Sequence, residues 1–331
     1  MLVASMLTSM PVLAGKTLDG IKARGVISCG VSTGLAGFSA MDSKGEWHGL
    51  DVDICKALAA ATLGDARKVK WVPLGSQQRF PALQSGEIDV LSHNTTWTLS
   101  RDASFGIHFT SIVYHDGQGF MVAKKTGISA VHQLSHADIC VQSGTTSEKT
   151  LNDYFRAQKM KFRPVVFENF EASLKAFFSG RCQAYTTDAS SLAAILQRET
   201  RNPGDYLVLA EVISKEPMSP AVRRGDDEWF AIVKWVVNAL IVAEEEQLTQ
   251  ANLDTQKEHG NAVVQGLLGN ADDIGKLLGL DRAWAYRAIQ AVGNYGDIFE
   301  RNLGSGSPLK LSRGANRLWT HGGLIYAPPI R

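Results

Sequence analysis

The spacing of apolar and polar residues changes several times along the first part of the chain. Short apolar runs predict strands, whereas apolar residues three and four positions apart predict amphipathic helices. These patterns predict a strand at 26–31, a helix at 51–63, a strand at 68–74, a helix at 77–85 and a strand at 87–93. Such alternation is typical of a parallel sheet that carries helices on its faces.

The same alternation returns between residues 137 and 198. Strands are predicted at 138–142, 163–168 and 182–187, with helices at 146–157, 170–179 and 190–199. In both "FPALQSGEIDVLSHN" and "LKAFFSGRCQAYTTD", an apolar helix leads through Ser-Gly into a strand and then to a polar residue, Asn94 or Asp188. Because ligands bind beyond the carboxyl ends of parallel strands, two such edges facing each other would form a cleft.

Glycine and proline interrupt strand-like runs at 114–120 and 214–222, which predicts that the chain crosses between the two modules there. Beyond the second crossing, helices are predicted at 227–246, 272–280 and 282–302. We expect the tryptophans and tyrosines of this region to pack a C-terminal extension against the first module.

Length and charge restrict the class of partner. A chain of 331 residues, 44% of them hydrophobic, exceeds the usual size of one domain. Its 34 basic and 33 acidic residues balance without a long basic block, so we expect neither nucleic acid nor an anionic membrane as a partner. A small molecule or another protein fits this composition better.

Residues 1–15 are apolar and contain "VLAG", a pattern typical of an export signal with cleavage after Ala14. The segment is too short to span a bilayer. Because it lacks the basic start of a complete signal, a frayed apolar tail is the alternative.

The four cysteines favour an oxidising compartment. Cys29 and Cys55 belong to the first module, on a predicted strand and on the helix that follows it, and Cys140 and Cys182 belong to the second. This placement predicts the disulfides Cys29–Cys55 and Cys140–Cys182. Four buried free thiols are the alternative, since cysteine is among the most buried residue types. No Cys/His cluster indicates a metal site.

One combination of residues fits the head group of a free amino acid. The guanidinium of Arg101 matches a carboxylate, and Thr96 can add a further donor. In "SGTTSE", Thr145 and Glu148 form a capping-box pattern that leaves N–H groups at a helix start free for an anion. Asp188 is an acceptor suited to an ammonium group.

Each of these elements also has a structural alternative. A surface ion pair with Asp102 would be an ordinary role for Arg101. The "GTTSE" segment is a helix cap whatever else it does, and Asp188 could cap the helix that begins near Ser190. His93 has neither a nucleophile nor a metal-ligand spacing beside it, so it is expected to be structural or exposed.

From about residue 16 onward, the chain resembles the periplasmic solute-binding proteins of polar amino-acid ABC transporters (bacterial extracellular solute-binding protein family 3), and most closely their general L-amino-acid binding subgroup. The resemblance rests on "CGVSTGLAGFS", "GLDVDICKALAAATLGD", "RFPALQSGEIDVLSHNTTWTLSRD", "CVQSGTTSE", "GRCQAYTTD" and "LWTHGGLIYAPPIR". It implies an α/β, two-lobed fold of the periplasmic-binding-protein type II class, each lobe a sheet flanked by helices, with a helical C-terminal extension. The expected parts are a signal-like segment at 1–15, lobe 1 with the extension at 16–117 plus 218–331, and lobe 2 at 118–217.

The resemblance also implies which residues contact a ligand, namely Ser32, Ser76, Asn94, Thr96, Arg101, Thr145, Thr146 and Asp188. In the family, the arginine clamps the α-carboxylate with help from the threonine positions, and the aspartate holds the α-ammonium. The asparagine position offers its backbone carbonyl to the ammonium. The two serine positions meet the ligand side chain, and small neutral residues there fit a broad range of ligands.

The implied function is capture of free L-amino acids in the periplasm of a Gram-negative bacterium and their delivery to an inner-membrane ABC permease. We expect a monomer without cofactor or metal. A dehydratase-type enzyme on the same scaffold, acting on a small carboxylate, is the alternative, and it would need a general acid or base within reach of its substrate. A ligand-sensing receptor is disfavoured because no transmembrane segment follows residue 331.

Overall fold

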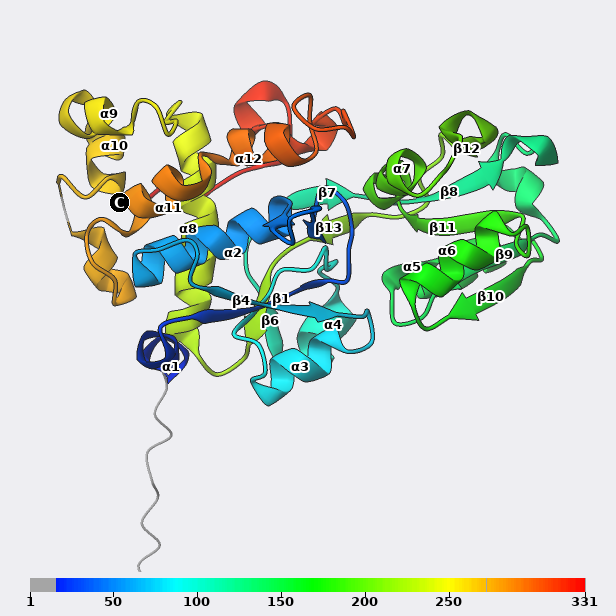
Figure 1. Ribbon diagram of the computed structural model, residues 1–331, viewed down its shortest axis with the longest axis horizontal. Helices are drawn as coiled ribbons and strands as arrows, with labels where there is room; N and C mark the ends of the chain where they lie inside the picture. The colour runs from blue at the N-terminus through cyan, green and yellow to red at the C-terminus, as the bar shows by residue number, and fades with distance from the viewer. Residues whose placement is uncertain (1–15, 272, 331) are drawn as a thin grey trace, which may run out of the picture.

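Two five-stranded sheets form the centres of two lobes that lie side by side (Figure 1). The computed structural model describes residues 16–271 and 273–330. The expected export signal at 1–15 lies outside the described residues. No helix in the described part of the chain is both long and apolar enough to cross a membrane.

The sheet of the first lobe has the order β4 (Val69–Leu74), β1 (Ile27–Ser32), β5 (Val90–Leu91), β14 (Ala221–Arg223), β6 (Ile107–Phe109). Its helices are α1 (Lys16–Arg24), α2 (Leu50–Leu63), α3 (Arg79–Ser85), α4 (Leu99–Ser104) and α8 (Asp227–Glu245). A short hairpin, β2 (Ala40–Met41) and β3 (Trp47–His48), precedes α2. Strand β1 is parallel to β4 and β5, as predicted.

The sheet of the second lobe has the order β10 (Arg163–Phe167), β9 (Asp138–Gln142), β11 (Ala184–Asp188), β8 (Gln118–Ala123), β12 (Tyr206–Val208). Its helices are α5 (Thr146–Ala157), α6 (Phe170–Phe178) and α7 (Ala189–Arg198), with 3₁₀ turns η1 (Lys124–Thr126), η2 (Val131–Leu134) and η3 (Pro203–Asp205). Here β9 is parallel to β10 and β11. Both modules therefore have the predicted parallel strands.

Each sheet also contains antiparallel strands that the hydrophobic pattern did not indicate. Strand β14 is antiparallel to β5 and β6, and β8 is antiparallel to β11 and β12. These strands enter their sheets directly from the crossings between the lobes, without the helical crossover that a parallel neighbour needs. The crossing strands, β7 (Tyr114–Asp116) and β13 (Glu216–Met218), pair with each other and lie between the lobes (Figure 1).

The C-terminal extension packs on the first lobe through one continuous core. Its helices are α9 (Leu253–His259), α10 (Ala262–Leu267), η4 (Ile274–Leu278), α11 (Trp284–Val292) and α12 (Tyr295–Asn302), followed by η5 (Gly314–Asn316) and η6 (Trp319–His321). Trp284 and Phe299 are fully buried in the same cluster as Trp229 of α8. Trp319 and Tyr326 are 54% and 60% exposed, so the expectation that all the aromatic residues pack inward was wrong for these two.

Three predicted elements differ from the structure. Within the described residues, the helix expected at 272–280 is the short 3₁₀ helix η4. The helix expected at 282–302 is two helices, because Gly293 has a φ of 78° and Asn294 caps α12. The strand expected at 87–93 is only the two residues of β5. After it, Ser92 and the residues that follow leave the sheet and form part of the loop that reaches the cavity described below.

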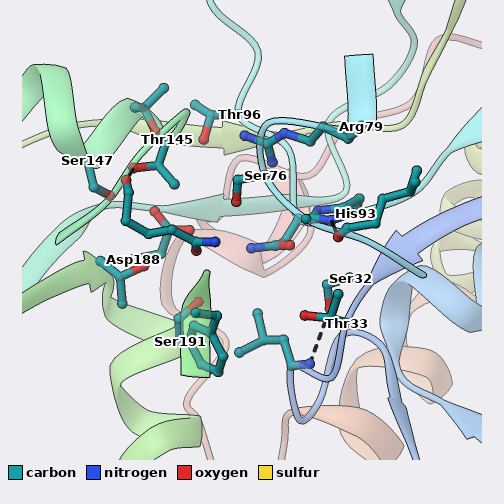
Figure 2. A pocket seen from close by; sticks show the side chains of 18 of the residues that line it. Ser32, Thr33, Ser76, Arg79, His93, Thr96, Thr145, Ser147, Asp188 and Ser191 are labelled. Carbon is teal, nitrogen blue, oxygen red and sulfur yellow. Dashed lines mark hydrogen bonds between the residues drawn. The ribbon is translucent and has the colours of Figure 1, made fainter. Parts of the chain in front are cut away.

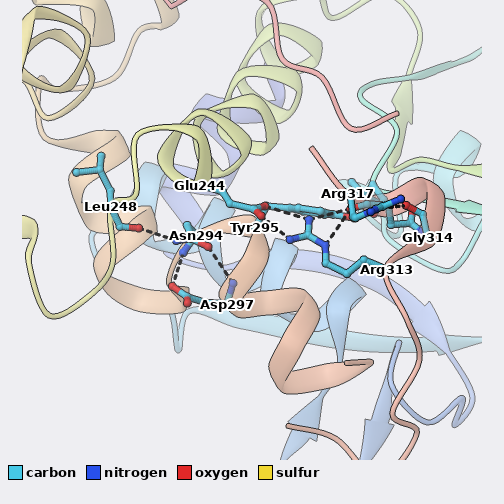
Figure 3. A network of polar contacts seen from close by, with 10 residues as sticks. Glu244, Leu248, Asn294, Tyr295, Asp297, Arg313, Gly314 and Arg317 are labelled. Atoms are coloured by element: carbon cyan, nitrogen blue, oxygen red, sulfur yellow. Dashed lines mark hydrogen bonds and ion pairs between the residues drawn. The ribbon is translucent and has the colours of Figure 1, made fainter. Parts of the chain in front are cut away.

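One ion pair fixes the end of the chain to α8. Arg313 bonds Glu244 at the end of α8, and its guanidinium lies 5.3 Å and 5.2 Å from the ring centres of Tyr295 and Phe299. Figure 3 shows this network beside Asn294, whose side-chain amide donates to the carbonyl of Leu248. The last segment is thus held by both charge and cation–π contacts.

Both predicted disulfides are present, and each lies within one lobe. Cys29 on β1 is joined to Cys55 on α2, with Cα atoms 6.4 Å apart. Cys140 on β9 is joined to Cys182, just before β11, with Cα atoms 5.7 Å apart. The sulfur atoms therefore crosslink neighbouring elements within each lobe and leave the lobes free to move relative to each other.

Candidate ligand-binding site between the lobes

A polar cavity lies between the two lobes and encloses about 630 Å³, including its open mouth. All the residues expected to contact a ligand line it, namely Ser32, Ser76, Asn94, Thr96, Arg101, Thr145, Thr146 and Asp188. Figure 2 shows Arg79 and His93 extending from one side and Asp188, Ser147 and Ser191 from the other. The structure thus brings together, at one place, residues that are far apart in the sequence.

Arg101 enters the cavity from the first turn of α4. Thr98 caps this helix by accepting a hydrogen bond from the Arg101 backbone N–H at 3.2 Å. The Arg101 side chain is 7% exposed and donates to the carbonyl of Thr96 at 2.9 Å and to that of Gly144, in the second lobe, at 3.5 Å. Its guanidinium is therefore held in place by neutral acceptors.

Asp102 is not the partner of Arg101, so the surface ion pair considered above is wrong. The Asp102 carboxylate instead lies 3.5 Å from Arg224 and accepts from the Trp97 indole at 3.3 Å. Burial lowers the pKa of Arg101 to about 10, while Glu216 and Asp188 act in the opposite direction. The group stays cationic at neutral pH and has no carboxylate within 4.0 Å among the described residues.

The start of α5 faces Arg101 across the cavity. Thr145 caps the helix by accepting from the Glu148 N–H at 3.2 Å, whereas the Glu148 carboxylate accepts from the N–H of Gly144 at 3.1 Å. The predicted capping pattern is thus present with one difference: the Glu148 side chain bonds the N–H of Gly144 and not that of the N-cap residue, Thr145. The N–H groups of the next helical residues, Thr146 and Ser147, are among the unpaired groups that every helix start presents to an anion.

Asp188 ends β11 and occupies the N-cap position of α7, yet its side chain makes no capping hydrogen bond. Asp116 of the crossing strand β7 takes over that role, because its carboxylate accepts from the backbone N–H of Ser190 at 3.3 Å and from the Ser190 hydroxyl. One carboxylate oxygen of Asp188 is buried without a partner in the described chain. The helix-cap alternative for Asp188 is therefore wrong, and its carboxylate is available to a ligand.

Burial is the main cause of a pKa for Asp188 well above its usual range. The carboxylates of Asp116 and Glu216 raise it further, while Arg79 and Arg101 oppose the shift. A cation placed beside Asp188 would favour its ionised form. The cavity therefore has an acidic end that gains from a bound ammonium group.

Asn94 is positioned by a buried carboxylate that the sequence did not reveal. Asp51, at the start of α2, accepts from the Asn94 N–H at 2.8 Å and from the Ser92 hydroxyl at 3.1 Å. Burial raises the pKa of Asp51 to about 7. With a φ of 36°, Asn94 adopts a left-handed conformation that asparagine tolerates better than most residues. These contacts fix the backbone at 94, the group through which the position was expected to act.

The two serines expected near a ligand side chain differ in their own contacts. The Ser32 hydroxyl bonds that of Ser39 at 2.7 Å and accepts from the N–H of Leu35 at 3.2 Å, so it shapes the loop after β1. Ser76, 8% exposed, lines the cavity directly after β4. Ser76 is therefore the better placed of the two to contact a ligand with its hydroxyl.

Sequence reasoning missed one ionisable residue of the cavity wall, Arg79, which opens α3 and is 4% exposed. Its place one helical turn before Ala82 and Leu83, on the buried face, is the signal that could have identified it. Of the two roles expected for His93, the structure shows the structural one: it is buried in the cavity wall and donates to the carbonyl of Leu74 at 2.7 Å. His93 is neutral because burial and Arg79 lower its pKa to about 4.

A possible cation group lies elsewhere, on the hairpin of β2 and β3. Asp42, Glu46 and His48 are exposed and bring their ligand atoms within 4.8 Å of one another. The Asp42 carboxylate already accepts from the N–H groups of Lys44 and Glu46 and bonds the imidazole of His48. This geometry is that of a tight turn on the surface, and none of the three residues lines the cavity.

Comparison with known proteins gives a consistent result. Residues 27–251 match the family described as bacterial extracellular solute-binding proteins, family 3. The chain is 53% identical over 317 residues to the general L-amino acid-binding periplasmic protein AapJ of Rhizobium johnstonii, covering 95% of this chain and 93% of that protein. It is 49% identical over 320 residues to the glutamate/glutamine/aspartate/asparagine-binding protein BztA of Rhodobacter capsulatus, covering 96% and 94%.

Among solved structures, the chain is similar to an ABC transporter/periplasmic binding protein from Brucella ovis with glutathione bound. The two share 53% sequence identity and a TM-score of 0.93, and the match covers 95% of this chain and 99% of that one. The likeness therefore extends over both lobes and the C-terminal extension.

Proposed function

The chain belongs to the bacterial extracellular solute-binding proteins, family 3, and from this premise we propose that it is the periplasmic component of an ABC transporter that binds free L-amino acids between its lobes. It delivers the bound amino acid to the transporter's membrane-embedded permease. The relatives of similar length carry names for this role, with amino acids as ligands.

The placement of Arg101 and Asp188 on opposite walls of one cavity carries this proposal. Each is buried, and neither has an ion partner among the described residues. A zwitterionic head group supplies both missing partners: its carboxylate binds Arg101, Thr96 and the N–H groups at the start of α5, and its ammonium binds Asp188. A ligand that carries only a carboxylate or an amide would supply a partner for Arg101 but none for Asp188.

Binding would close the lobes because the ligand contacts both of them. Only the closed arrangement makes every head-group contact at once, so the amino acid stabilises that arrangement over the open one. The crossing strands are suited to this motion because they contact helices that line the cavity. Asp116 accepts a hydrogen bond from the Ser190 hydroxyl of α7, and Glu216 accepts one from the Thr146 hydroxyl of α5 at 2.8 Å.

The dehydratase alternative gains no support. The relatives of high identity are solute-binding transport proteins and not enzymes. His93 is the histidine of the cavity wall, and it already donates its Nε2 hydrogen to Leu74. The arrangement supports binding and release of an unchanged molecule.

Thermal unfolding of ligand-stripped protein with each of the twenty amino acids tests this proposal. An amino acid present at about one hundred times its dissociation constant is expected to stabilise the protein by about 2.7 kcal/mol. Calorimetry then gives the affinity, and mass spectrometry of the released ligand checks that it is recovered unchanged. If no amino acid shifts the unfolding transition, the proposed function is wrong.

A further inference from the structure

Outside the two crossings, the hydrogen bonds between the lobes all meet at one turn of lobe 2. In the described residues these bonds end on Ser143 and Gly144, directly after β9. Two of them are donated by arginines of the cavity wall to the Gly144 carbonyl. The third runs from the side-chain amide of Gln77 to the Ser143 hydroxyl, at 2.8 Å. Because neither Gln77 nor Ser143 lines the cavity, this third bond joins the lobes without using a group of the ligand site.

Ser143 is held in place by contacts within its own lobe. Its backbone N–H and its hydroxyl both donate to the Phe167 carbonyl of β10, at 2.9 Å and 3.3 Å. The hydroxyl hydrogen is thus used, which leaves the hydroxyl oxygen to accept from Gln77. The neighbouring Gly144 is fixed as well, because its N–H donates to the Glu148 carboxylate at 3.1 Å. The acceptor of the interlobe bond therefore has a fixed position in lobe 2.

The loop that carries Gln77 is fixed in lobe 1 in the same way. It follows β4, and the N–H of Gly75 donates to the Gln78 side chain at 3.1 Å, while the Gly75 carbonyl accepts from the Gln78 N–H at 3.0 Å. Gln77 also packs closely on Gly144, where a Cβ atom would lie 2.9 Å from the Gln77 Cγ and 3.4 Å from its backbone nitrogen. The hydrogen bond and the packing form at one point, and both require that the lobes meet.

A contact of this kind shifts the balance between open and closed lobes. It exists only when the lobes meet, so it stabilises the closed arrangement whether or not a ligand is present. We propose that Gln77 and Ser143 form a latch that strengthens the binding of every ligand of the cavity by the same factor. The apparent dissociation constant is the intrinsic one divided by the closed fraction, so a contact that raises this fraction does not choose among ligands. The inference rests on the proposed function, which places an amino acid between the lobes.

Calorimetry of Gln77→Ala with several amino acids tests the latch. The dissociation constant of each ligand should rise by the same factor, about 2- to 10-fold, because one hydrogen bond between neutral groups is lost. Ser143→Ala should have a similar effect. The double variant should bind about as tightly as either single variant, since both changes remove the same bond. In stopped-flow measurements the dissociation rate should rise and the association rate should stay unchanged, because the latch forms after the ligand has entered.

Gln250→Ala is the matched control, because the Gln250 amide donates to the carbonyl of Gln290 at 2.7 Å within the C-terminal extension. This variant should leave every affinity unchanged. Far-ultraviolet circular dichroism checks that each variant folds, and Ser143→Ala decides if Gln77→Ala does not fold. Unchanged affinities in a folded Gln77→Ala would overturn the inference, as would a change for one amino acid that leaves the others unaffected.

Small-angle X-ray scattering of the ligand-free protein tests the latch independently of the proposed function. Gln77→Ala should have a larger radius of gyration than the unmodified protein, because fewer of its molecules have closed lobes. Equal radii would contradict a latch that acts without a ligand. If the unmodified protein binds no amino acid, the proposed function is wrong, and the scattering comparison still decides whether the latch exists.

Discussion

At the level of single residues, the capping of α7 by Asp116 leaves the Asp188 carboxylate available to a ligand. Asp116 bonds the N–H and hydroxyl of Ser190, so Asp188 is not needed as a cap although it occupies that position. The resulting carboxylate is buried, lacks a partner for one oxygen and has a raised pKa. Such a group destabilises the ligand-free protein and becomes favourable when a cation binds.

Asp188→Asn should therefore stabilise the ligand-free protein and abolish amino-acid binding. Because folding raises the pKa of Asp188, its ionised form costs stability above that pKa and costs nothing below the unfolded value of about 3.9. The free energy of unfolding should rise by roughly 0.5–2 kcal/mol near neutral pH, and this gain should shrink as the pH is lowered. Urea unfolding at several pH values, with calorimetry for binding, measures both effects.

Asp153→Asn is the matched control, because Asp153 is exposed and its pKa is lowered by its hydrogen bond with Lys149. That variant should show no gain in stability and should keep its affinity. Wild-type affinity in Asp188→Asn would show that Asp188 does not bind the ammonium group. A stability gain independent of pH would show that the ionised Asp188 carboxylate is not what destabilises the ligand-free protein.

Sequence reasoning predicted a site whose eight positions all line one cavity, but it missed Arg79. Arg101 and Asp188 follow predicted strands. Because open sheets bind ligands beyond the carboxyl ends of their strands, the sequence indicated that both residues lie at the site. Arg79 opens a helix, and arginine is mostly exposed at such positions. Its burial results from the second lobe, whose Gly144 carbonyl reaches it across the cavity, and sequence periodicity carries no information on that contact.

At the level of elements, the short helix α4 determines where Arg101 points. The helix has only six residues, so its start depends on the Thr98 cap more than on helix length. On the facing side, Gly144 combines a φ of 74° with a close approach to Gln77, where a Cβ atom would lie 2.9 Å from the Gln77 Cγ. Glycine is therefore required at the point where the lobes meet.

Thr98→Ala is expected to weaken amino-acid binding, and the loss of affinity should exceed what the loss of folding stability alone would cause. Loss of the cap should cost about 1 kcal/mol of folding free energy and should loosen the turn that carries Arg101. Asn261→Ala removes an equivalent cap from α10, in the C-terminal extension, and should cost similar stability without loss of affinity. Equal effects of the two variants on affinity would contradict this role of α4.

Predicted and observed elements differ where local signals are short. Strands β6, β7, β13 and β14 have three residues each, too few for a reliable apolar pattern. The division between α11 and α12 was marked in the sequence by Gly293 and Asn294, a helix stop followed by a cap, but continuous apolar spacing on both sides masked it. The long strands and helices, by contrast, follow their hydrophobic patterns closely.

At the level of the whole molecule, the two lobes are separate cores joined by two crossings. The apolar clusters of the lobes remain distinct for the most part, and each lobe has its own disulfide. Contacts across the cavity are few and polar, such as the bond from the Gln77 amide to the Ser143 hydroxyl at 2.8 Å. A ligand that bridges the lobes can therefore alter their relative position at little cost to either core.

The crystal structure of the protein with the amino acid that gives the largest thermal shift tests the central claim most directly. The α-carboxylate is predicted to lie against Arg101, Thr96 and the N–H groups at the start of α5, with the α-ammonium against Asp188. Both contacts should be present in the same closed arrangement of the lobes. An amino acid bound outside this cavity, or with its ammonium away from Asp188, would contradict the account.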